Sequence, residues 1–484
     1  MKDIRNYING KWCKAVGGET FAKINPHNGE ALCRVARSGE KDAESAIAAA
    51  KAAQPAWSDQ TVVARGDLLR AVALRIRERR VDLIAAVAEE MGKAPKLAAG
   101  EADAAIEMGM FIAGEGRRYY GRTTTASMAH RSVTVVRQPL GVAGLIISFN
   151  TPFPNIAWKV FPALLCGNAA VLKPSEETPL SARLFCEICH EIGIPPGVIN
   201  VVHGFGKEVG APMVESPDVA LISFTGSAET GRWIQETAGR RLAKVCMELG
   251  GKNALVVCDD ADMDNAVNWT IQAAFSNAGQ RCAAASRIVV FDAVYERFRN
   301  ALVAATQKLK IGSTDDSDCG PVINEAAIKR LTSAVQDAVG RGGKVLCGGD
   351  RLRDEEHAGG FYMAPTLMEG VAADAPISRN ELFGPVAVLY RVSDFAAALA
   401  LVNDCPYGLT ASIHTASLHR AMRFADKVQA GVVVVNGGTH GSEPHMGFGG
   451  VKNSGTGWRE AGVEALDVYS DWKYINLIID PGKV

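Results

Sequence analysis

Cys282 lies in the segment NAGQRCAAASR, residues 277 to 287, among a glycine and several alanines. These small neighbours predict a turn, although most cysteines of folded proteins are buried and inert. A thiol on such a turn can act as a nucleophile once its thiolate forms. On this segment alone both interpretations stay open, and the decision depends on what other groups the chain supplies.

Two further segments carry groups that a thiol nucleophile needs. Asn150 follows an apolar run in FNTPFP, and its amide can donate hydrogen bonds to an oxyanion without titrating. Glu248 lies between apolar residues in MELGG, where burial would raise its pKa and suit it to general-base catalysis. A salt-bridged structural acid is the alternative for Glu248. Another acid, Glu381, lies in the apolar segment NELFGP.

The elements that must position these groups are mainly those of an α/β protein. Residues 40–120 are rich in Ala, Leu, Arg and Glu at helical spacing, which predicts three or four helices. Over residues 141–257, apolar runs (GVAGLIISF, AAVLK, VINVV, VALISF and NALVV) alternate with helical segments, as in βαβ units with a parallel sheet. A second series, from ASRIVVF to AGVVVVN with helices over 295–308 and 325–340, predicts a second α/β domain. The last strand, in LDVYSDWKYINLIID, has no partner nearby in sequence.

Three of these strand ends carry residues that suit a nucleotide. Parallel sheets bind ligands beyond the carboxyl ends of their strands, where helix N-termini offer N–H groups. VINVV is followed by HGFGKEVG, which differs from the dinucleotide fingerprint by one extra residue. VALISF is followed by Thr225-Gly226-Ser227, in which Ser227 can cap a helix, and AAVLK by Lys173-Pro174-Ser175-Glu176. Taken singly, each one is equally compatible with an ordinary βα turn.

Composition narrows the possible partners. A chain of 484 residues predicts two or three domains. The 52 basic and 53 acidic residues leave a net charge of −1, so nucleic acid and anionic membranes are not expected as partners. The start, MKDIRNYING, lacks the apolar core of a signal peptide, and no apolar run is long enough to span a membrane. Eleven scattered cysteines predict reduced thiols in a cytoplasmic protein.

Two metal-related patterns are not expected to bind metal. CEICH, residues 186–190, has the spacing of a haem attachment site, but its segment has helical periodicity. We therefore interpret Cys186 and Cys189 as residues that pack a helix. The nine histidines show no paired spacing of the kind that binds zinc, so no metal site is expected.

Together, Cys282, Asn150, Glu248, Glu381 and the strand-end motifs resemble the NAD(P)-dependent aldehyde dehydrogenase superfamily. The resemblance covers nearly the whole chain and is densest between FNTPFP and MGFGGVKNSG. It implies an α/β fold with a Rossmann-like cofactor domain, an α/β catalytic domain and a small β oligomerisation arm, in a homodimer or homotetramer. The implied boundaries are 1–119 and 140–251 for the cofactor domain, 252–465 for the catalytic domain, and 120–139 and 466–484 for the arm.

The resemblance also implies roles for individual residues. Cys282 would attack an aldehyde, Asn150 and the Cys282 N–H would hold the oxyanion, and Glu248 would activate the water that hydrolyses the thioester. Glu176 would favour NAD, although NADP stays possible. The cofactor would contact Phe149, Lys173, Ser175, Glu176, Gly206, Gly210, Phe224, Thr225, Gly226, Ser227, Leu249, Gly250, Glu381 and Phe383. The substrate tunnel would be lined by Asn155, Trp158, Arg281, His440 and Phe448.

Arg281, beside the nucleophile, suggests the kind of aldehyde. Its guanidinium can attract a carboxylate or phosphonate tail, or it can point into the protein and support the loop. We expect oxidation of a small polar or acid-tailed aldehyde to its acid. One alternative is a CoA-acylating relative, but that branch usually lacks the base that Glu248 supplies. The other is a non-catalytic relative, which would not need the complete set of reactive groups.

Overall fold

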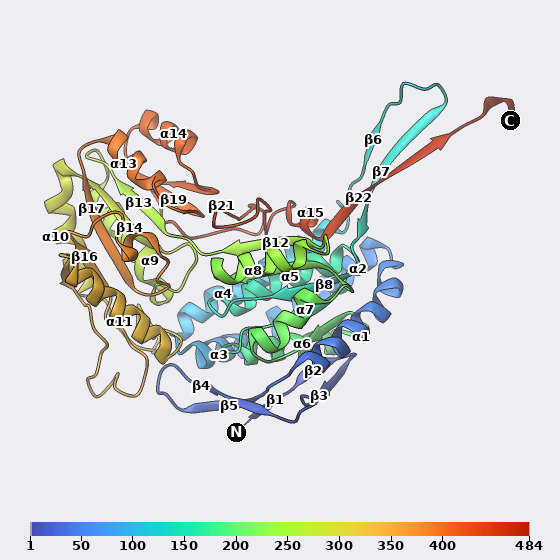
Figure 1. The fold of residues 1–484 in the computed structure, drawn as a ribbon, viewed down its shortest axis with the longest axis horizontal. Coiled ribbons are helices and arrows are strands. Elements are labelled where there is room, and N and C mark those ends of the chain that lie inside the picture. The colour runs from blue at the N-terminus through green and yellow to red at the C-terminus, as the bar shows by residue number, and fades with distance from the viewer. Residues whose placement is uncertain (1, 484) are drawn as a thin grey trace.

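The computed structural model describes residues 2–483 and contains two large sheets (Figure 1). The first has the strand order β12-β11-β8-β9-β10-β2-β3, in which β8 to β12 run parallel and β2 and β3 are antiparallel additions. The strands are β2 (Asn6–Ile8), β3 (Lys11–Cys13), β8 (Val142–Ile146), β9 (Ala169–Lys173), β10 (Ile199–Val201), β11 (Val219–Gly226) and β12 (Lys244–Leu249).

Helices cover both faces of this sheet, which explains why β8, β9 and β10 are buried throughout and mainly apolar. α1, α7 and α8 pack on one face and α5 and α6 on the other, with α2 and α4 behind them. Four helices within residues 40–120 confirm the prediction for that segment. The helices are α1 (Glu40–Ser58), α2 (Val62–Glu78), α3 (Arg80–Met91), α4 (Pro95–Glu115), α5 (Pro152–Leu165), α6 (Pro179–Ile192), α7 (Ala211–Glu215) and α8 (Ala228–Gly239).

The second sheet has the order β15-β16-β17-β14-β13-β19-β20 and is parallel except for β15. α9 and α10 cover one face, and α11, α13 and α14 the other. The strands are β13 (Asn253–Val257), β14 (Ala285–Phe291), β15 (Lys344–Cys347), β16 (Thr366–Glu369), β17 (Val386–Val392), β19 (Thr410–His414) and β20 (Val432–Val435). The helices are α9 (Met263–Phe275), α10 (Tyr295–Thr306), α11 (Glu325–Gly340), α12 (Pro376–Arg379), α13 (Phe395–Asn403) and α14 (Leu418–Lys427).

One strand lies in a different sheet from the one that its sequence suggested. NALVV is β13 and begins the second sheet, whereas the fifth parallel strand of the first sheet is β12, which carries Glu248. Both strands are buried on both faces, so composition alone does not show which sheet they join. The predicted helix over 295–308 is α10, which ends at Thr306.

Smaller elements complete the fold. β1, β4 and β5 form an N-terminal sheet, and β18 pairs with β21. These strands are β1 (Lys2–Ile4), β4 (Thr20–Ile24), β5 (Ala31–Ala36), β18 (Tyr407–Gly408) and β21 (Val451–Lys452). The remaining short elements are α15 (Ala465–Tyr469), a π-helical turn (Gly206–Gly210) and three 3₁₀ turns (Ser276–Gly279, Asp292–Val294 and Pro481–Lys483). Within the described chain, no helix is both long and apolar enough to cross a bilayer.

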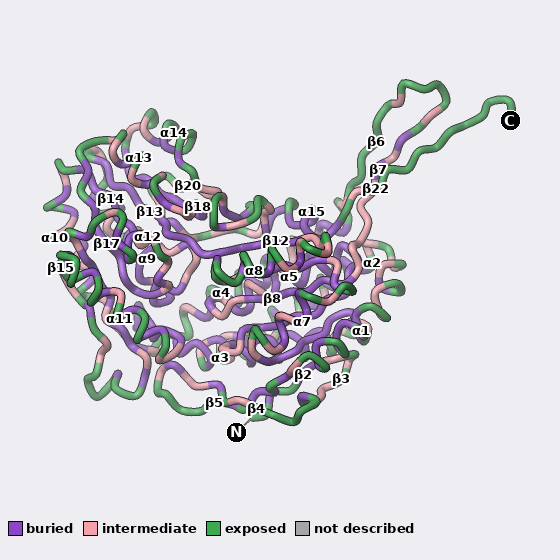
Figure 2. Tube along the Cα trace, viewed as in Figure 1, coloured by how far each residue is buried: buried purple, intermediate pink, exposed green. Residues whose placement is uncertain are grey.

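The C-terminal strand belongs to an arm that projects from the body of the molecule (Figure 1). β22 (Ser470–Ile478) pairs antiparallel with β7 (Arg131–Pro139), which also pairs with β6 (Arg122–Thr124). The tail strand therefore does have a partner in its own chain, more than 300 residues away. Figure 2 shows that most of the arm is exposed. The exposed apolar residues of the arm include Tyr474, Leu477 and Ile478.

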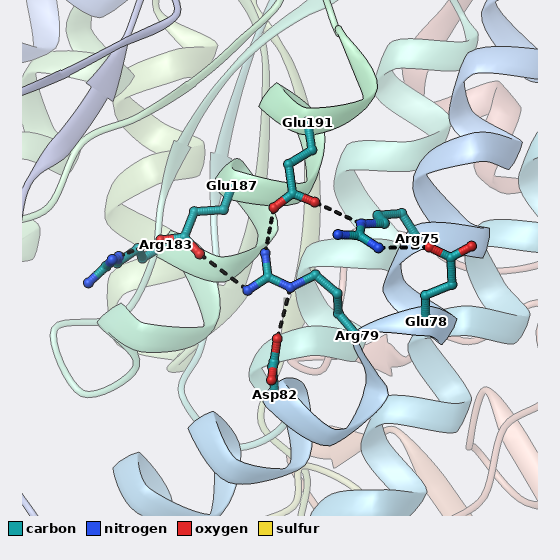
Figure 3. A network of polar contacts seen from close by, with 7 residues as sticks. All are labelled: Arg75, Glu78, Arg79, Asp82, Arg183, Glu187 and Glu191. Atoms are coloured by element: carbon teal, nitrogen blue, oxygen red, sulfur yellow. Dashed lines mark hydrogen bonds and ion pairs between the residues drawn. The ribbon is translucent and has the colours of Figure 1, made fainter.

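A network of charged side chains ties α6 to α2 and α3 (Figure 3). Arg79 lies 2.9 Å from Asp82 and 2.8 Å from Glu191, and Glu191 also lies 2.7 Å from Arg75. Exposed ion pairs of this kind add little stability singly, and a network adds more. On the buried side of α6, Cys186 and Cys189 are 0 % and 1 % exposed, which confirms that they pack the helix.

Candidate active site

The site lies where the carboxyl ends of the first sheet face the amino ends of the second. In the first sheet the chain runs from β8 to β9 and β10 and then returns to β11, on the other side of β8. Such a reversal opens a crevice at the carboxyl ends of the two strands on either side of it. Asn150 follows β8 and Glu248 lies near the end of β12, while Cys282 and Glu381 precede β14 and β17.

Cys282 lies in a tight turn between α9 and β14. Asn277, Ala278 and Gly279 have left-handed backbone conformations, with φ of 56°, 54° and 64°. Such a run is strained for residues other than glycine, and strain of this kind clusters at functional sites. A Cβ on Gly279 would overlap the Gly384 carbonyl. The turn leaves Cys282 half-buried.

Asn253 fastens this turn to the second sheet. Its Nδ2 donates to the Cys282 carbonyl at 2.7 Å and to the Ala284 carbonyl at 2.9 Å, and its Oδ1 accepts from the Thr410 N–H at 3.0 Å. Gly251 packs against the same carbonyl so closely that a Cβ would lie 2.5 Å from it. The Cys282 carbonyl is therefore held by Asn253 and by close packing against Gly251. A larger residue at position 251 would not fit beside it.

The side-chain Nδ2 of Asn150 donates no hydrogen bond to any residue between 2 and 483. Its Oδ1 accepts from Asn155 Nδ2 at 3.2 Å, which distinguishes the oxygen from the nitrogen and turns Nδ2 the other way. The main-chain carbonyl of Asn150 accepts from Asn277 Nδ2 at 3.0 Å and from Lys93 Nζ at 3.5 Å. The amide is thus oriented from one side and its backbone is tied to the turn of the thiol.

The N–H of Cys282 is a second available donor. The Arg281 carbonyl accepts from the Ala284 N–H at 3.0 Å. In a trans peptide the next N–H points the opposite way, so the Cys282 N–H is directed away from this turn. Two N–H groups, from Asn150 and Cys282, can therefore converge on an oxyanion.

The Cys282 thiol is protonated at neutral pH in this structure. Burial raises its pKa from 9.0 to about 12, and the nearby carboxyl groups of Glu381 and Glu248 act in the same direction. The Ala283 N–H and the Arg281 guanidinium oppose this shift. Because thiolate is the reactive form, a base must remove the proton when substrate is present.

Glu248 is a candidate base and is unusually isolated. It is 5 % exposed, and neither carboxyl oxygen has a hydrogen-bond partner within the described chain. Burial, followed by the charge of Glu460, raises its pKa well above the ordinary value of 4.5. A Cβ on Gly449 would lie 2.9 Å from its Oε1, so glycine keeps space beside the carboxyl. A buried carboxyl with a raised pKa suits transfer of a proton to or from water.

The residues predicted to bind the cofactor lie at the carboxyl ends of the first sheet and at the amino ends of the second, which face each other. Lys173 is buried at the end of β9 and lies 3.5 Å from the half-exposed Glu176. Ser227 caps α8, as predicted, because its side chain accepts from the Thr230 N–H at 3.2 Å. Near these lie Phe149, Ser175, Phe224, Thr225, Gly226, Leu249 and Gly250 on the first sheet, and Glu381 and Phe383 on the second. Gly206 and Gly210 form a π-helical turn that runs into α7, not an open glycine loop.

These groups fit a nicotinamide dinucleotide. The N-terminus of α8, with Ser227, offers hydrogen-bond donors for a pyrophosphate. Glu176 and Glu381 offer carboxylates for two riboses, and within residues 2–483 only the Gly251 N–H, at 3.1 Å, donates to Glu381. Phe149 and Phe383 meet edge to face with ring centroids 5.5 Å apart. The donors at the N-terminus of α8, with Glu176 and Glu381 as acceptors on either side, match the pyrophosphate of NAD between its two riboses.

Glu381→Gln is expected to stabilise the cofactor-free protein more at pH 8 than at pH 5. Burial raises the pKa of Glu381 from 4.5 to about 7, so the folded chain keeps a proton that the unfolded chain releases. The contribution of Glu381 to the free energy of unfolding is largest below pH 4.5. It falls by about 3 kcal/mol in all as the pH rises through 7. Thermal melts at both pH values measure the difference. Equal gains at both pH values, or the same pattern for the exposed Glu44→Gln, would contradict this explanation.

The residues predicted to line a substrate tunnel gather beside the thiol. Trp158 and Phe448 pack with Cys282 in one cluster, with ring centroids 5.5 Å apart. The Arg281 Nε and the His440 Nδ1 are buried and have no hydrogen-bond partner within residues 2–483. Burial, and then the charge of Arg281, lowers the pKa of His440 to about 4. His440 is therefore neutral, and within residues 2–483 no acid pairs with the Arg281 Nε.

Several residues around the site were not identified from sequence. Asn253 and Asn277 belong to the quoted motifs, but their hydrogen bonds depend on segments far away in the chain. Lys93 is paired with Glu101, and Lys159 with Glu460; all four are nearly inaccessible to solvent. Lysine and glutamate are usually exposed, so no local pattern marks these pairs.

A sheet whose strand ends suit a nucleotide faces a strained cysteine turn, two candidate oxyanion donors and a buried carboxyl. This arrangement is typical of an oxidoreductase that works through a covalent thiol. The comparisons with known proteins agree. The chain belongs to the aldehyde dehydrogenase family, whose model matches residues 12–475, and it is an NAD(P)-dependent aldehyde dehydrogenase. This confirms the predicted family, fold and reaction class.

Individual relatives match over nearly their whole length. The chain is 38 % identical over 470 residues to the NADP-dependent succinate-semialdehyde dehydrogenase GabD of Escherichia coli, covering 97 % of this chain and 96 % of the relative. It is 37 % identical to a glutarate-semialdehyde dehydrogenase of Pseudomonas putida, with coverage of 97 % and 96 %. The solved structure of betaine aldehyde dehydrogenase from Staphylococcus aureus in complex with NAD+ matches with a TM-score of 0.96 at 33 % identity, covering 99 % and 95 %.

Proposed function

We propose that this enzyme oxidises small acid-tailed aldehydes, of the semialdehyde class, to the corresponding dicarboxylic acids. The observation that carries the proposal is Arg281, a guanidinium next to the nucleophile whose buried Nε has no partner within residues 2–483. Burying part of a cation without an acid is costly, and a substrate carboxylate would compensate it. Relatives named for succinate and glutarate semialdehydes support the same class.

We propose that the first half of the reaction takes place on Cys282. The thiol gives up its proton to solvent water, and the sulfur then bonds to the aldehyde carbon. Asn150 Nδ2 and the Cys282 N–H donate to the resulting oxyanion of the thiohemiacetal. NAD(P)+ supplies the acceptor for the hydride that leaves this carbon. The oxyanion re-forms a carbonyl, so Cys282 now carries a thioester.

In the second half, Glu248 would take a proton from water, and the hydroxide would attack the thioester carbonyl. The same two N–H groups stabilise the new oxyanion, the carbon–sulfur bond breaks, and the carboxylic acid leaves. The raised pKa of Glu248 and the lack of hydrogen-bond partners for its oxygens within residues 2–483 support this role, because the carboxyl can hold the proton without competing hydrogen bonds. They also favour hydrolysis over transfer of the acyl group to CoA. Product analysis with and without CoA tests this choice.

For the cofactor, we propose a preference for NAD over NADP. Glu176 sits at the end of β9, where an acid accepts hydrogen bonds from a free ribose and repels a 2′-phosphate. In this arrangement residues 1–119 and 140–251 bind the cofactor, and residues 252–465 supply the nucleophile. A cytoplasmic location is also proposed, supported by the presence of all eleven cysteines as unpaired thiols.

Arg281→Met is expected to lower kcat/KM for four- and five-carbon aldehyde acids by about 100-fold, because a charge-assisted pair is lost. Uncharged aldehydes of the same length should react as well as before. Steady-state kinetics on both substrate series measure the effect, with the exposed Arg423→Met as a matched control. An equal loss on both series would mean that Arg281 supports the loop and does not bind the tail.

We also propose that the arm, residues 120–139 and 466–484, joins copies of the chain into a homodimer or homotetramer. β22 exposes Leu477 and Ile478, and β20 is a partly exposed edge strand of four valines. Unpaired edges and exposed apolar strands favour association. Leu477→Lys is expected to shift the protein toward monomer in sedimentation velocity, whereas Leu242→Lys, at a site 93 % exposed, should not. A wild-type chain that sediments as a monomer would exclude the proposal.

A further inference from the structure

We propose that Lys23, Glu177 and Asn324 form a bridge that sets the distance between the two cofactor-binding loops, so that Glu177 and Asn324 are positioning residues. The Glu177 carboxylate receives a hydrogen bond from Lys23 Nζ at 2.7 Å and another from Asn324 Nδ2 at 2.8 Å. Lys23 belongs to the N-terminal sheet and Asn324 to the half of the chain that carries the second sheet. The inference rests on the proposed cofactor roles of Glu176 and Glu381.

One end of the bridge is the loop that carries Glu176. Glu177 is its direct neighbour, and the Glu177 N–H donates to Ser175 Oγ at 3.2 Å. The Lys23 side chain is only 1 % exposed, so its ammonium depends on Glu177 for compensation. Breaking a buried pair of this kind leaves an unpaired charge, which makes the contact difficult to rearrange. The pair therefore fixes the loop from which Glu176 reaches the ribose site.

The other end of the bridge is the N-terminus of α11. The Asn324 Oδ1 accepts from the Ala327 N–H at 3.0 Å and so caps the helix, while its Nδ2 points to Glu177. One turn further along, Arg330 donates to the Leu382 carbonyl at 3.1 Å and 3.3 Å. Leu382 directly follows Glu381. α11 thus acts as a rigid link from Glu177 to the loop of the second carboxylate.

The bridge spans the two halves of the cofactor site. Glu176 and Glu381 are attached to different sheets, so their separation depends on how those sheets are held together. A hydrogen bond to a charged group contributes enough to change a binding constant about tenfold. Losing the bridge should therefore weaken cofactor binding, while the turn of Cys282 and the oxyanion donors keep their own supports.

Asn324→Ser tests the bridge, because serine can still cap α11 but is too short to reach Glu177. We expect the Kd for NAD, measured by calorimetry, and the KM for NAD to rise about tenfold. The kcat at saturating NAD and the KM for aldehyde should stay unchanged. Asp394→Ser, which alters the cap of α13 in the same way, is the matched control and should leave all four values unchanged.

A second variant separates a specific bridge from general damage. In a Glu177→Ala background, Asn324→Ser should have no further effect on the Kd, since the partner is already absent. Additive effects, or a parallel loss of kcat and of aldehyde affinity, would overturn the bridge. Glu176→Gln and Glu381→Gln check the assumption beneath it. If these two leave NAD binding unchanged, the proposed cofactor roles fail; if they weaken binding and Asn324→Ser does not, only the bridge fails.

Discussion

Cys282→Ala should reduce aldehyde-dependent NADH formation by about 10⁴-fold or more, for every aldehyde tested. The variant removes the only atom that we expect to bond to the substrate carbon. Water could attack the aldehyde instead, but it is a weaker nucleophile than sulfur and is not held in position by the turn. The increase in NADH absorbance, followed with an excess of aldehyde and enzyme, measures the loss.

Binding of NAD should survive this change. The proposed cofactor contacts lie on Glu176, Ser227 and Glu381, and none of them depends on the Cys282 side chain. Cys347→Ala is the matched control, because Cys347 is also half-buried but lies on β15, away from the site. Retained turnover in Cys282→Ala would refute the assignment of the nucleophile, whereas lost NAD binding would point to misfolding.

Glu248→Gln should lower steady-state turnover by about 10²- to 10⁴-fold while leaving a rapid first release of NADH. Glutamine preserves the shape and burial of the side chain but cannot accept a proton from water. The thioester on Cys282 would then form and persist. A rapid-mixing experiment should show a burst of about one NADH per active site, followed by a slow phase, as expected when an acyl-enzyme accumulates.

The burst distinguishes two roles for Glu248. If it is the base only for hydrolysis, the burst keeps its rate and the slow phase is limited by deacylation. If the burst also disappears, Glu248 is needed to activate the thiol as well, and its place in the second half alone is wrong. The exposed Glu443→Gln, in the loop before Phe448, should behave as wild type and controls for a change of local charge.

Much of this protein follows from local sequence. The apolar runs with β-branched residues predict the buried parallel strands, and the helical spacing within 40–120 predicts three or four helices, because these preferences depend on near neighbours. Ser227 as a helix cap and Cys186 as a packing residue follow in the same way. The segment around Cys282 indicates a turn because small residues and glycine permit one.

Only the tertiary structure decided how these pieces combine. NALVV joined the second sheet and the tail strand paired with β7, since the choice of strand partner depends on contacts hundreds of residues away. The raised pKa of Glu248 and the orientation of the Asn150 amide arise from burial and from groups such as Asn155 that meet only in the fold. The local sequence therefore identified the candidate reactive groups Cys282, Asn150 and Glu248. The charge state and alignment of these groups required the packing of two sheets against each other, because desolvation and hydrogen-bond geometry are set by non-local neighbours. The same holds for the Arg281 Nε, which has no partner in the described part of the chain.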